Sequence, residues 1–263
     1  MIFTSSYGEI YYEIYGPKDS MAVAFIHGIF ADHWLLKKLA IQYQDQYRVI
    51  LWDMPEHGQS VKLGKDFDFS VTADCFIELL DELGFEKVAL VGVSLGGVVG
   101  QYIAARYPDR IRGLAVEGAF PLHVNLKKVA FGFRLYSAVV KLIPWRFLLI
   151  SFKKMTAKMA VDDDLKEYME TVFLEMDKTG LLRMVNGARK GISQGIEKPV
   201  QQPVLITHGD REMSMLRKMC AHWHQESPNS EYAVIPSAGH GAVFFNSEEY
   251  NQVLRPFLRK LII

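Results

Sequence analysis

A serine stands between an apolar run and a glycine-rich stretch in LVGVSLGGVVGQ, residues 90–101. The residues before Ser94 are typical of a buried strand and those after it of a helix start, which predicts a tight strand-to-helix turn. Gly92 and Gly96 flank the serine where a Cβ would collide with the turn. Free N–H groups at the helix start would face a developing oxyanion. The pattern predicts a nucleophilic hydroxyl, and the alternative is a glycine-rich helix–strand contact with a solvated serine.

A serine hydroxyl is a weak nucleophile that needs a base, and the base needs an orienting acid. Among the eight histidines, His240 follows the last predicted strand on a glycine-flanked loop. Such loops lie at the sheet edge where open α/β sheets place their sites. His208 also ends a strand but precedes the candidate acids, and His222 and His224 fall within a predicted helix. We therefore predict His240 as the base.

The acid is expected after the strand PVLITHG, where Asp210 and Glu212 both occur. Either carboxylate could fix the imidazole tautomer and stabilise the imidazolium, and spacing alone does not choose between them. Glu117, which ends an earlier strand, is a third possibility.

A second oxyanion donor is expected from another loop at the same edge. His27 and Gly28 close a strand, so the backbone N–H of Ile29 is expected beside that of Leu95. We interpret His27 as structural, hydrogen-bonded beneath this loop.

These residues are positioned by alternating strands and helices, which predicts an α/β fold with a mostly parallel central sheet flanked by helices. The expected strands fall at 2–6, 9–15, 22–28, 48–53, 87–93, 111–118, 203–209 and 231–236. The expected helices fall at about 34–42, 71–83, 95–107, 214–225 and 247–260. Strands disappear between about Pro121 and Gly195, so we predict a core domain of 1–120 and 196–263 with a helical cap inserted at 121–195.

The predicted cap carries more apolar side chains than a short helical insertion can bury within itself. Some of them should face the catalytic cleft and form an apolar pocket for an acyl or alkyl group. We select Phe131, Phe133 and Trp145 from the cap, with Phe30 from the oxyanion loop, as candidate substrate-binding residues. Residues 129–152 contain Arg134, Lys141 and Arg146 as well as a proline, so an apolar cap or a membrane-surface helix fits better than a bilayer span.

Composition and charge narrow the classes of protein to which the chain can belong. The 263 residues are 49% hydrophobic and 23% charged with a formal net charge of zero, which favours a globular protein and gives no sign of nucleic acid or of an anionic membrane as a partner. Cys75 and Cys220 are expected to be reduced and packed against the core. We see no secretory signal and predict a cytoplasmic protein. The chemistry requires no cofactor, and no metal-ligand cluster is evident; the expected partner is a small apolar ester or acyl substrate.

Five segments together resemble the α/β-hydrolase family and span almost the whole chain outside the insertion. They are HGIF (27–30), DMPEHGQS (53–60), GVSLGG (92–97), HGDRE (208–212) and SAGHGAVF (237–244). The resemblance implies the α/β-hydrolase fold, a catalytic triad of Ser94, His240 and an acid, and an oxyanion hole formed by the N–H groups of Ile29 and Leu95. It places the acid three residues after Gly209, at Glu212, although the family more often has Asp there.

The same resemblance implies that Asp53 and Ser60 hold the 53–60 loop and that His57 is structural. We favour Glu212 over Asp210 as the acid, because Asp210 matches a family position that is often acidic without being catalytic. Ser94 argues against a dehalogenase or an epoxide hydrolase, for which the resemblance would imply Asp at that position.

We therefore expect a serine hydrolase, a carboxylesterase that cleaves small to medium apolar esters through an acyl-enzyme on Ser94. The alternatives are a C–C bond hydrolase, a lactonase or an acyltransferase of the same fold, or a slow-turnover ligand-binding or signalling module.

Overall fold

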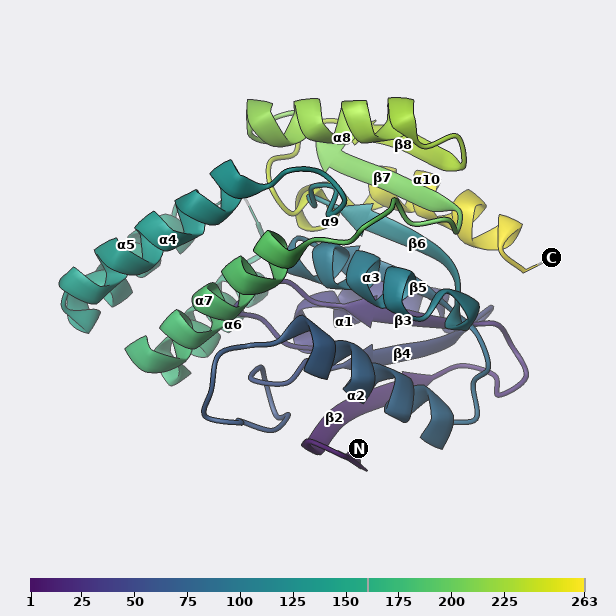
Figure 1. The fold of residues 1–263 in the computed structure, drawn as a ribbon, viewed down its shortest axis with the longest axis horizontal. Coiled ribbons are helices and arrows are strands. Elements are labelled where there is room, and N and C mark those ends of the chain that lie inside the picture. The colour runs from purple at the N-terminus through teal and green to yellow at the C-terminus, as the bar shows by residue number, and fades with distance from the viewer. Residues whose placement is uncertain (160, 263) are drawn as a thin grey trace.

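Eight strands form one sheet in the computed structural model, which describes residues 1–159 and 161–262 (Figure 1). Their order is β1-β2-β4-β3-β5-β6-β7-β8. The pairs β1–β2 and β2–β4 are antiparallel, and every later pair is parallel. The strands are β1 (Ile2–Ser5), β2 (Gly8–Tyr15), β3 (Ala22–Ile26), β4 (Arg48–Trp52), β5 (Val88–Val93), β6 (Ile111–Glu117), β7 (Val204–Gly209) and β8 (Ser230–Ile235).

Helices cover both faces of this sheet, and four of them are inserted between β6 and β7. The core helices are α1 (Trp34–Ala40), α2 (Phe69–Glu82), α3 (Leu95–Arg106), α8 (Ser214–Glu226), α9 (Ala242–Phe245) and α10 (Ser247–Lys260), with short 3₁₀ turns η1 (Ile41–Tyr43) and η2 (Pro108–Arg110). The inserted helices are α4 (Lys127–Leu142), α5 (Trp145–Thr156), α6 (Asp163–Glu175) and α7 (Lys178–Gln194).

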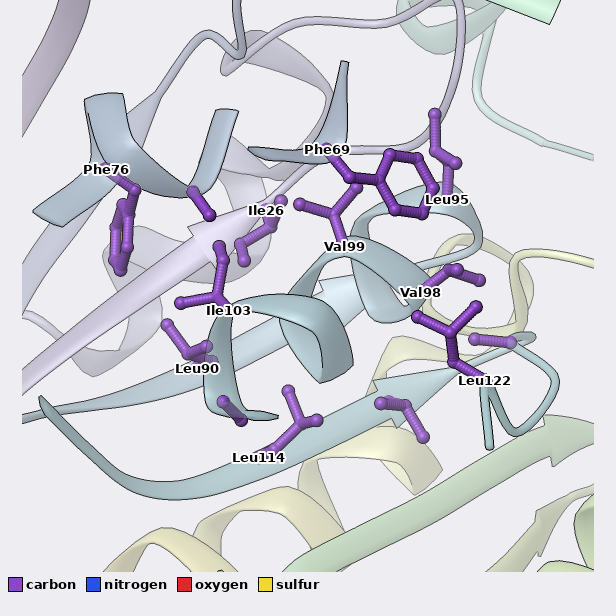
Figure 2. Close-up of a cluster of buried hydrophobic side chains, with 14 of the residues drawn as sticks. Ile26, Phe69, Phe76, Leu90, Leu95, Val98, Val99, Ile103, Leu114 and Leu122 are labelled. Atoms are coloured by element: carbon purple, nitrogen blue, oxygen red, sulfur yellow. The ribbon is translucent and has the colours of Figure 1, made fainter. Parts of the chain in front are cut away.

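The inner parallel strands are buried on both faces, which explains their continuous apolar runs. In β3, Ala24 and Ile26 pack into a cluster with α2, α3 and α8, whereas Val23 and Phe25 pack into a second cluster with α1 and α10. Figure 2 shows part of the first cluster, where Phe69 and Phe76 of α2 lie near Val99 and Ile103 of α3. Two apolar layers thereby hold the carboxyl ends of the strands in fixed positions.

The inserted helices project from one side of the sheet (Figure 1). They have a small apolar cluster of their own, in which Phe152 stacks on Phe173 at a ring distance of 3.9 Å and Trp145 stacks on Phe173 at 5.3 Å. The Ser137 hydroxyl donates to the Asn186 side chain at 2.9 Å and joins α4 to α7.

The predicted α/β-hydrolase fold is confirmed, and the expected strands and core helices all occur. The first core helix ends at Ala40 and continues as the 3₁₀ turn η1, and the one-turn helix α9 was not expected. Cys75 and Cys220 are unpaired and buried, as expected. No single helix within 1–159 and 161–262 has the length and apolar character to cross a bilayer, although the bent pair α4 and α5 does by length and composition together.

Candidate active site

Ser94 lies in a sharp turn between β5 and α3. Its φ of 54° and ψ of −119° are strained for a residue with a Cβ. A Cβ on Gly92 would lie 2.5 Å from the Gly96 carbonyl oxygen, and one on Gly96 would lie 2.1 Å from the Ile26 carbonyl oxygen. Glycine is therefore required at both flanking positions for the turn to close against the neighbouring strand.

A continuous hydrogen-bond chain runs from Ser94 to Glu212. The Ser94 Oγ and His240 Nε2 are 2.9 Å apart, and His240 Nδ1 lies 2.7 Å from Glu212 Oε2. The second Glu212 oxygen accepts the Met213 N–H at 2.8 Å. Three side chains that are far apart in sequence meet because β5, β7 and β8 end at the same sheet edge. The arrangement has the reach that a nucleophile, base and orienting acid require.

The two other candidate acids do not contact His240. Asp210 is exposed, and its Oδ1 accepts the Ala238 N–H at 3.0 Å. Glu117 is completely buried, and its Oε1 accepts the Ala242 N–H at 2.8 Å. Each of these carboxylates therefore holds the backbone of the loop that carries His240.

Charge in the site is distributed between His240 and the carboxyl groups beneath it. Burial opposes a charge on His240, but the hydrogen bond to Glu212 and the charges of Glu117 and Glu212 outweigh it and raise its pKa. Burial also opposes a charge on Glu212, but the hydrogen bond and charge of His240 lower its pKa below the usual value. Burial raises the pKa of Glu117 to about 7. Glu212 is thus kept as a carboxylate ready to stabilise an imidazolium.

The loop after β3 lies against the Ser94 turn. A Cβ on Gly28 would be 3.6 Å from the Ser94 Cβ, and Phe30 adopts a positive φ of 62° just beyond it. Leu95 is the first residue of α3, so its N–H has no acceptor within the helix. Ile29 and Leu95 line the same cavity as Ser94, and their N–H groups stay the predicted oxyanion donors.

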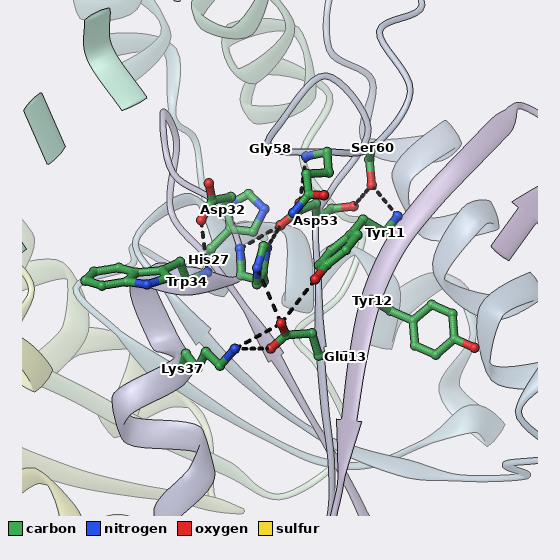
Figure 3. A network of polar contacts seen from close by, with 12 residues as sticks. Tyr11, Tyr12, Glu13, His27, Asp32, Trp34, Lys37, Asp53, Gly58 and Ser60 are labelled. Carbon is green, nitrogen blue, oxygen red and sulfur yellow. Dashed lines mark hydrogen bonds and ion pairs between the residues drawn. The ribbon is translucent and has the colours of Figure 1, made fainter. Parts of the chain in front are cut away.

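A polar network supports the underside of this loop (Figure 3). His27 is fully buried, and its Nε2 accepts the Met54 N–H at 3.1 Å. Asp53 accepts from the His33 and Gln59 N–H groups at 2.6 and 2.8 Å. The Ser60 hydroxyl donates to the Asp53 carbonyl at 2.7 Å. These contacts confirm the structural interpretation of His27 and the loop-holding interpretation of Asp53 and Ser60.

His57 also belongs to this supporting structure. Its Nδ1 lies 3.0 Å from the Pro55 carbonyl oxygen, and burial lowers its pKa to about 3, so the ring is neutral at ordinary pH. This confirms the structural interpretation of His57.

Asp32, His33 and Asp53 bring three potential metal-ligand atoms within 4.8 Å of one another. Asp53 already accepts N–H groups on both oxygens, and Asp32 Oδ1 accepts the Trp34 N–H and the Tyr168 hydroxyl. The hydrogen-bond donors around this cluster fit a structural network better than a metal centre.

An apolar cavity of about 610 Å³ opens at Ser94 and His240. Phe30 and Phe133 line it, as expected from the sequence. Phe131 instead lies on the solvent side of α4, and Trp145 is used in the apolar cluster among the inserted helices. Both residues differ from expectation for the same reason. An apolar pattern shows which residues share a helix face, but it does not show which other element or cavity that face contacts.

Several cavity residues were not selected from the sequence. Tyr136 of α4 and Met213 and Met215 from the start of α8 line the cavity. Gly118 lies behind His240, where an added Cβ would be 3.2 Å from the imidazole. The methionines directly follow Glu212 in sequence, which is a signal that could have found them, and Gly118 directly follows Glu117.

Comparisons with known proteins agree with this geometry. Residues 22–247 match the alpha/beta hydrolase fold family. The chain belongs to this family of enzymes. The whole chain also superposes on 99% of a thermophilic esterase from Thermogutta terrifontis, with a TM-score of 0.82 and 22% sequence identity.

Two curated relatives match most of the chain. The pimeloyl-[acyl-carrier protein] methyl ester esterase of Neisseria meningitidis is 22% identical over 92% of this chain and 95% of its own length. The dihydrolipoyllysine-residue acetyltransferase component of the acetoin cleaving system of Pseudomonas putida is 26% identical over 93% of this chain. The match spans 65% of that longer protein.

Proposed function

We propose that the protein is a serine carboxylesterase that cleaves small to medium apolar esters. The observation that carries the proposal is the hydrogen-bond chain from Ser94 through His240 to Glu212, in which Ser94 and His240 line an apolar cavity. The curated esterase relative from Neisseria meningitidis supports the ester chemistry.

In the proposed mechanism, the Ser94 hydroxyl gives its proton to His240 Nε2 as Oγ attacks the ester carbonyl carbon. Glu212 stabilises the imidazolium that forms, and the N–H groups of Ile29 and Leu95 bind the oxyanion. His240 then protonates the leaving alcohol, which leaves an acyl-enzyme on Ser94. Water attacks this ester with His240 again as the base, and the carboxylic acid is released.

The cavity supplies the proposed specificity. Its lining is almost entirely apolar, with Lys128 and His240 as the basic side chains among the lining residues. An acyl or alkyl group entering it removes apolar surface from water at roughly 25 cal/mol per Å². We also propose that residues 121–195 act as a cap, because α4 contributes Phe133 and Tyr136 to the lining of the cavity that contains Ser94.

A panel of p-nitrophenyl esters of rising acyl length tests the proposal. Hydrolysis should depend on Ser94, and a fluorophosphonate probe should label the wild type but not Ser94→Ala. Labelling that persists in Ser94→Ala would show that the nucleophile is another residue. Tight ester binding with negligible product release would instead identify a slow-turnover binding module.

Acyl transfer is the second candidate, and the acetyltransferase relative from Pseudomonas putida favours it. An apolar cavity that admits an alcohol in place of water would divert the acyl-enzyme to a new ester. Turnover in the presence of a primary alcohol, with both products measured by mass spectrometry, separates the two functions. A transfer product that dominates over the free acid would replace the hydrolase proposal.

A further inference from the structure

Helix α4 has an apolar stripe on its solvent side. Phe131, Leu135, Val139 and Leu142 recur at the spacing of one helix face, and their exposed fractions are 62%, 56%, 44% and 85%. The buried side of α4 carries Ala130, Ser137 and Val140 instead. A helix of a globular protein usually turns its apolar stripe to the core. The stripe on α4 is instead left exposed by the described part of the chain, which is unusual for so many large apolar side chains.

The next helix also carries exposed apolar side chains. Phe147, Ile150 and Met155 of α5 are each 50% exposed. A bend of 120° separates α4 from α5, and the two helices form the outermost part of the molecule at the left of Figure 1. We call α4 and α5 together the α4–α5 hairpin. It presents exposed apolar side chains that the described residues, 1–159 and 161–262, leave accessible to solvent.

The charged side chains of the α4–α5 hairpin itself are all basic, whereas α6, which packs against α5, carries acidic residues that include Glu170. Residues 121–159 contain no Asp or Glu, although the whole chain has a net charge of zero. The basic residues of this segment, all exposed, are Lys127, Lys128, Arg134, Lys141, Arg146, Lys153, Lys154 and Lys158. Within the described part of the chain, Lys153 is the only one of these within 4.0 Å of a carboxylate, at 3.9 Å from Glu170.

We propose that the α4–α5 hairpin docks on an anionic phospholipid surface. Exposed apolar side chains beside unpaired cations are the pattern of helices that lie in the plane of a membrane interface, with the apolar face at the headgroup–acyl boundary. The cations would meet lipid phosphates, whose negative charge attracts Lys and Arg side chains near such a surface.

A second copy of the chain fits the same surface less well than an anionic lipid surface does. A two-fold interface pairs the same patch from both subunits. It would bring two clusters of unpaired cations together with no acidic residue of the segment to offset them. A surface rich in phosphate has the complementary charge.

Docking would place the catalytic cavity at the lipid surface. Lys128, Gly132 and Tyr136 line the cavity and lie on α4 beside the exposed stripe. If the proposed esterase function holds, apolar esters dissolved in the membrane could reach Ser94 without crossing water. This consequence rests on the proposed function, whereas the docking itself does not.

Co-sedimentation of the full chain with vesicles tests the docking. We expect binding to vesicles of phosphatidylcholine and phosphatidylglycerol, weakening with added salt, and little binding to phosphatidylcholine alone. Leu135→Ser with Val139→Ser, and separately Arg134→Glu with Lys141→Glu, should each lower the partition coefficient by about tenfold or more. Matched controls are Val234→Ser, an exposed apolar residue on β8, and Lys218→Glu on α8; both should bind as the wild type does.

Catalysis and docking are separated by Ser94→Ala, which should bind vesicles like the wild type whether or not the esterase proposal holds. Circular dichroism checks that each variant is folded. The proposal is overturned if the wild type does not co-sediment with anionic vesicles, or if the hairpin variants bind these vesicles as well as the control variants do. It is also overturned if light scattering shows that the wild type is a dimer and that the double variant Leu135→Ser with Val139→Ser is a monomer, because a second copy would then cover the stripe.

Discussion

Replacing Glu212 with glutamine tests the proposed acid directly, because both of its carboxylate oxygens are already acceptors. One oxygen accepts from His240 Nδ1 at 2.7 Å and the other from the Met213 N–H at 2.8 Å. An amide has a single acceptor oxygen. Glu212→Gln must therefore place an NH₂ group against one of these two donors.

If the NH₂ group faces His240, the imidazole has to place its proton on Nε2, and it can no longer accept the Ser94 proton. The reasoning then predicts a loss of about 10³–10⁴ in kcat, equivalent to about 4–5 kcal/mol of transition-state stabilisation. If the NH₂ group faces Met213, the catalytic tautomer survives, but a neutral amide stabilises the imidazolium less and the Met213 N–H loses its partner. That arrangement costs about 1–3 kcal/mol of folding stability as well as activity.

Steady-state hydrolysis of a p-nitrophenyl ester and thermal unfolding measure both losses. Asp210→Asn is the matched control, because the asparagine oxygen can still accept the Ala238 N–H that Asp210 accepts now. Its activity should stay within about fivefold of the wild type. The reasoning is refuted if Glu212→Gln keeps more than about a tenth of wild-type activity with unchanged thermal stability, or if Asp210→Asn is the more damaging change.

Three further predictions follow from the site and its supports. Since only neutral His240 accepts a proton, kcat/KM should fall with decreasing pH through its raised pKa, and a pH–rate profile flat down to about pH 5 would contradict this. Burial raises the pKa of Glu117 from 4.5 to about 7, so as pH rises between these values the unfolded chain releases this proton while the folded protein keeps it, and up to about 3 kcal/mol of stability is lost. Urea unfolding at acid and alkaline pH should show this loss in the wild type and not in Glu117→Gln. Gly96→Ala puts a Cβ 2.1 Å from a β3 carbonyl oxygen and should cost about 1–3 kcal/mol or more in thermal unfolding. The control Gly132→Ala meets nothing within 4 Å and should be neutral or stabilising.

The strands and core helices could be predicted because their periodicity reflects burial. Strands β3 and β5 are buried throughout and are therefore continuous apolar runs. Helix α10 has one apolar face against the sheet, and its predicted bounds of 247–260 match the structure. Helix α9 has only four residues, too few for a helical period to be recognised.

The candidate site was only partly predictable. Ser94 and its glycines form a local pattern whose steric cause lies within a few residues, and His240 could be placed by the sheet edge that its strand reaches. The contents of the cavity depend on how α4 packs, which the sequence pattern leaves open. Phe131 and Phe133 are two residues apart on α4, yet only Phe133 lines the cavity.

The carboxyl groups near His240 show why spacing alone could not choose the acid. Asp210 accepts the N–H of Ala238, two residues before His240, and Glu117 accepts the N–H of Ala242, two residues after it. The loop is thereby held on both sides of the imidazole, while Glu212 is left to accept from the ring itself. Carboxyl groups at the ends of neighbouring strands thus have different roles because each accepts from a different donor. These donors come together only when β6, β7 and β8 pair side by side, so the sequence spacing alone does not show which carboxyl group accepts from His240.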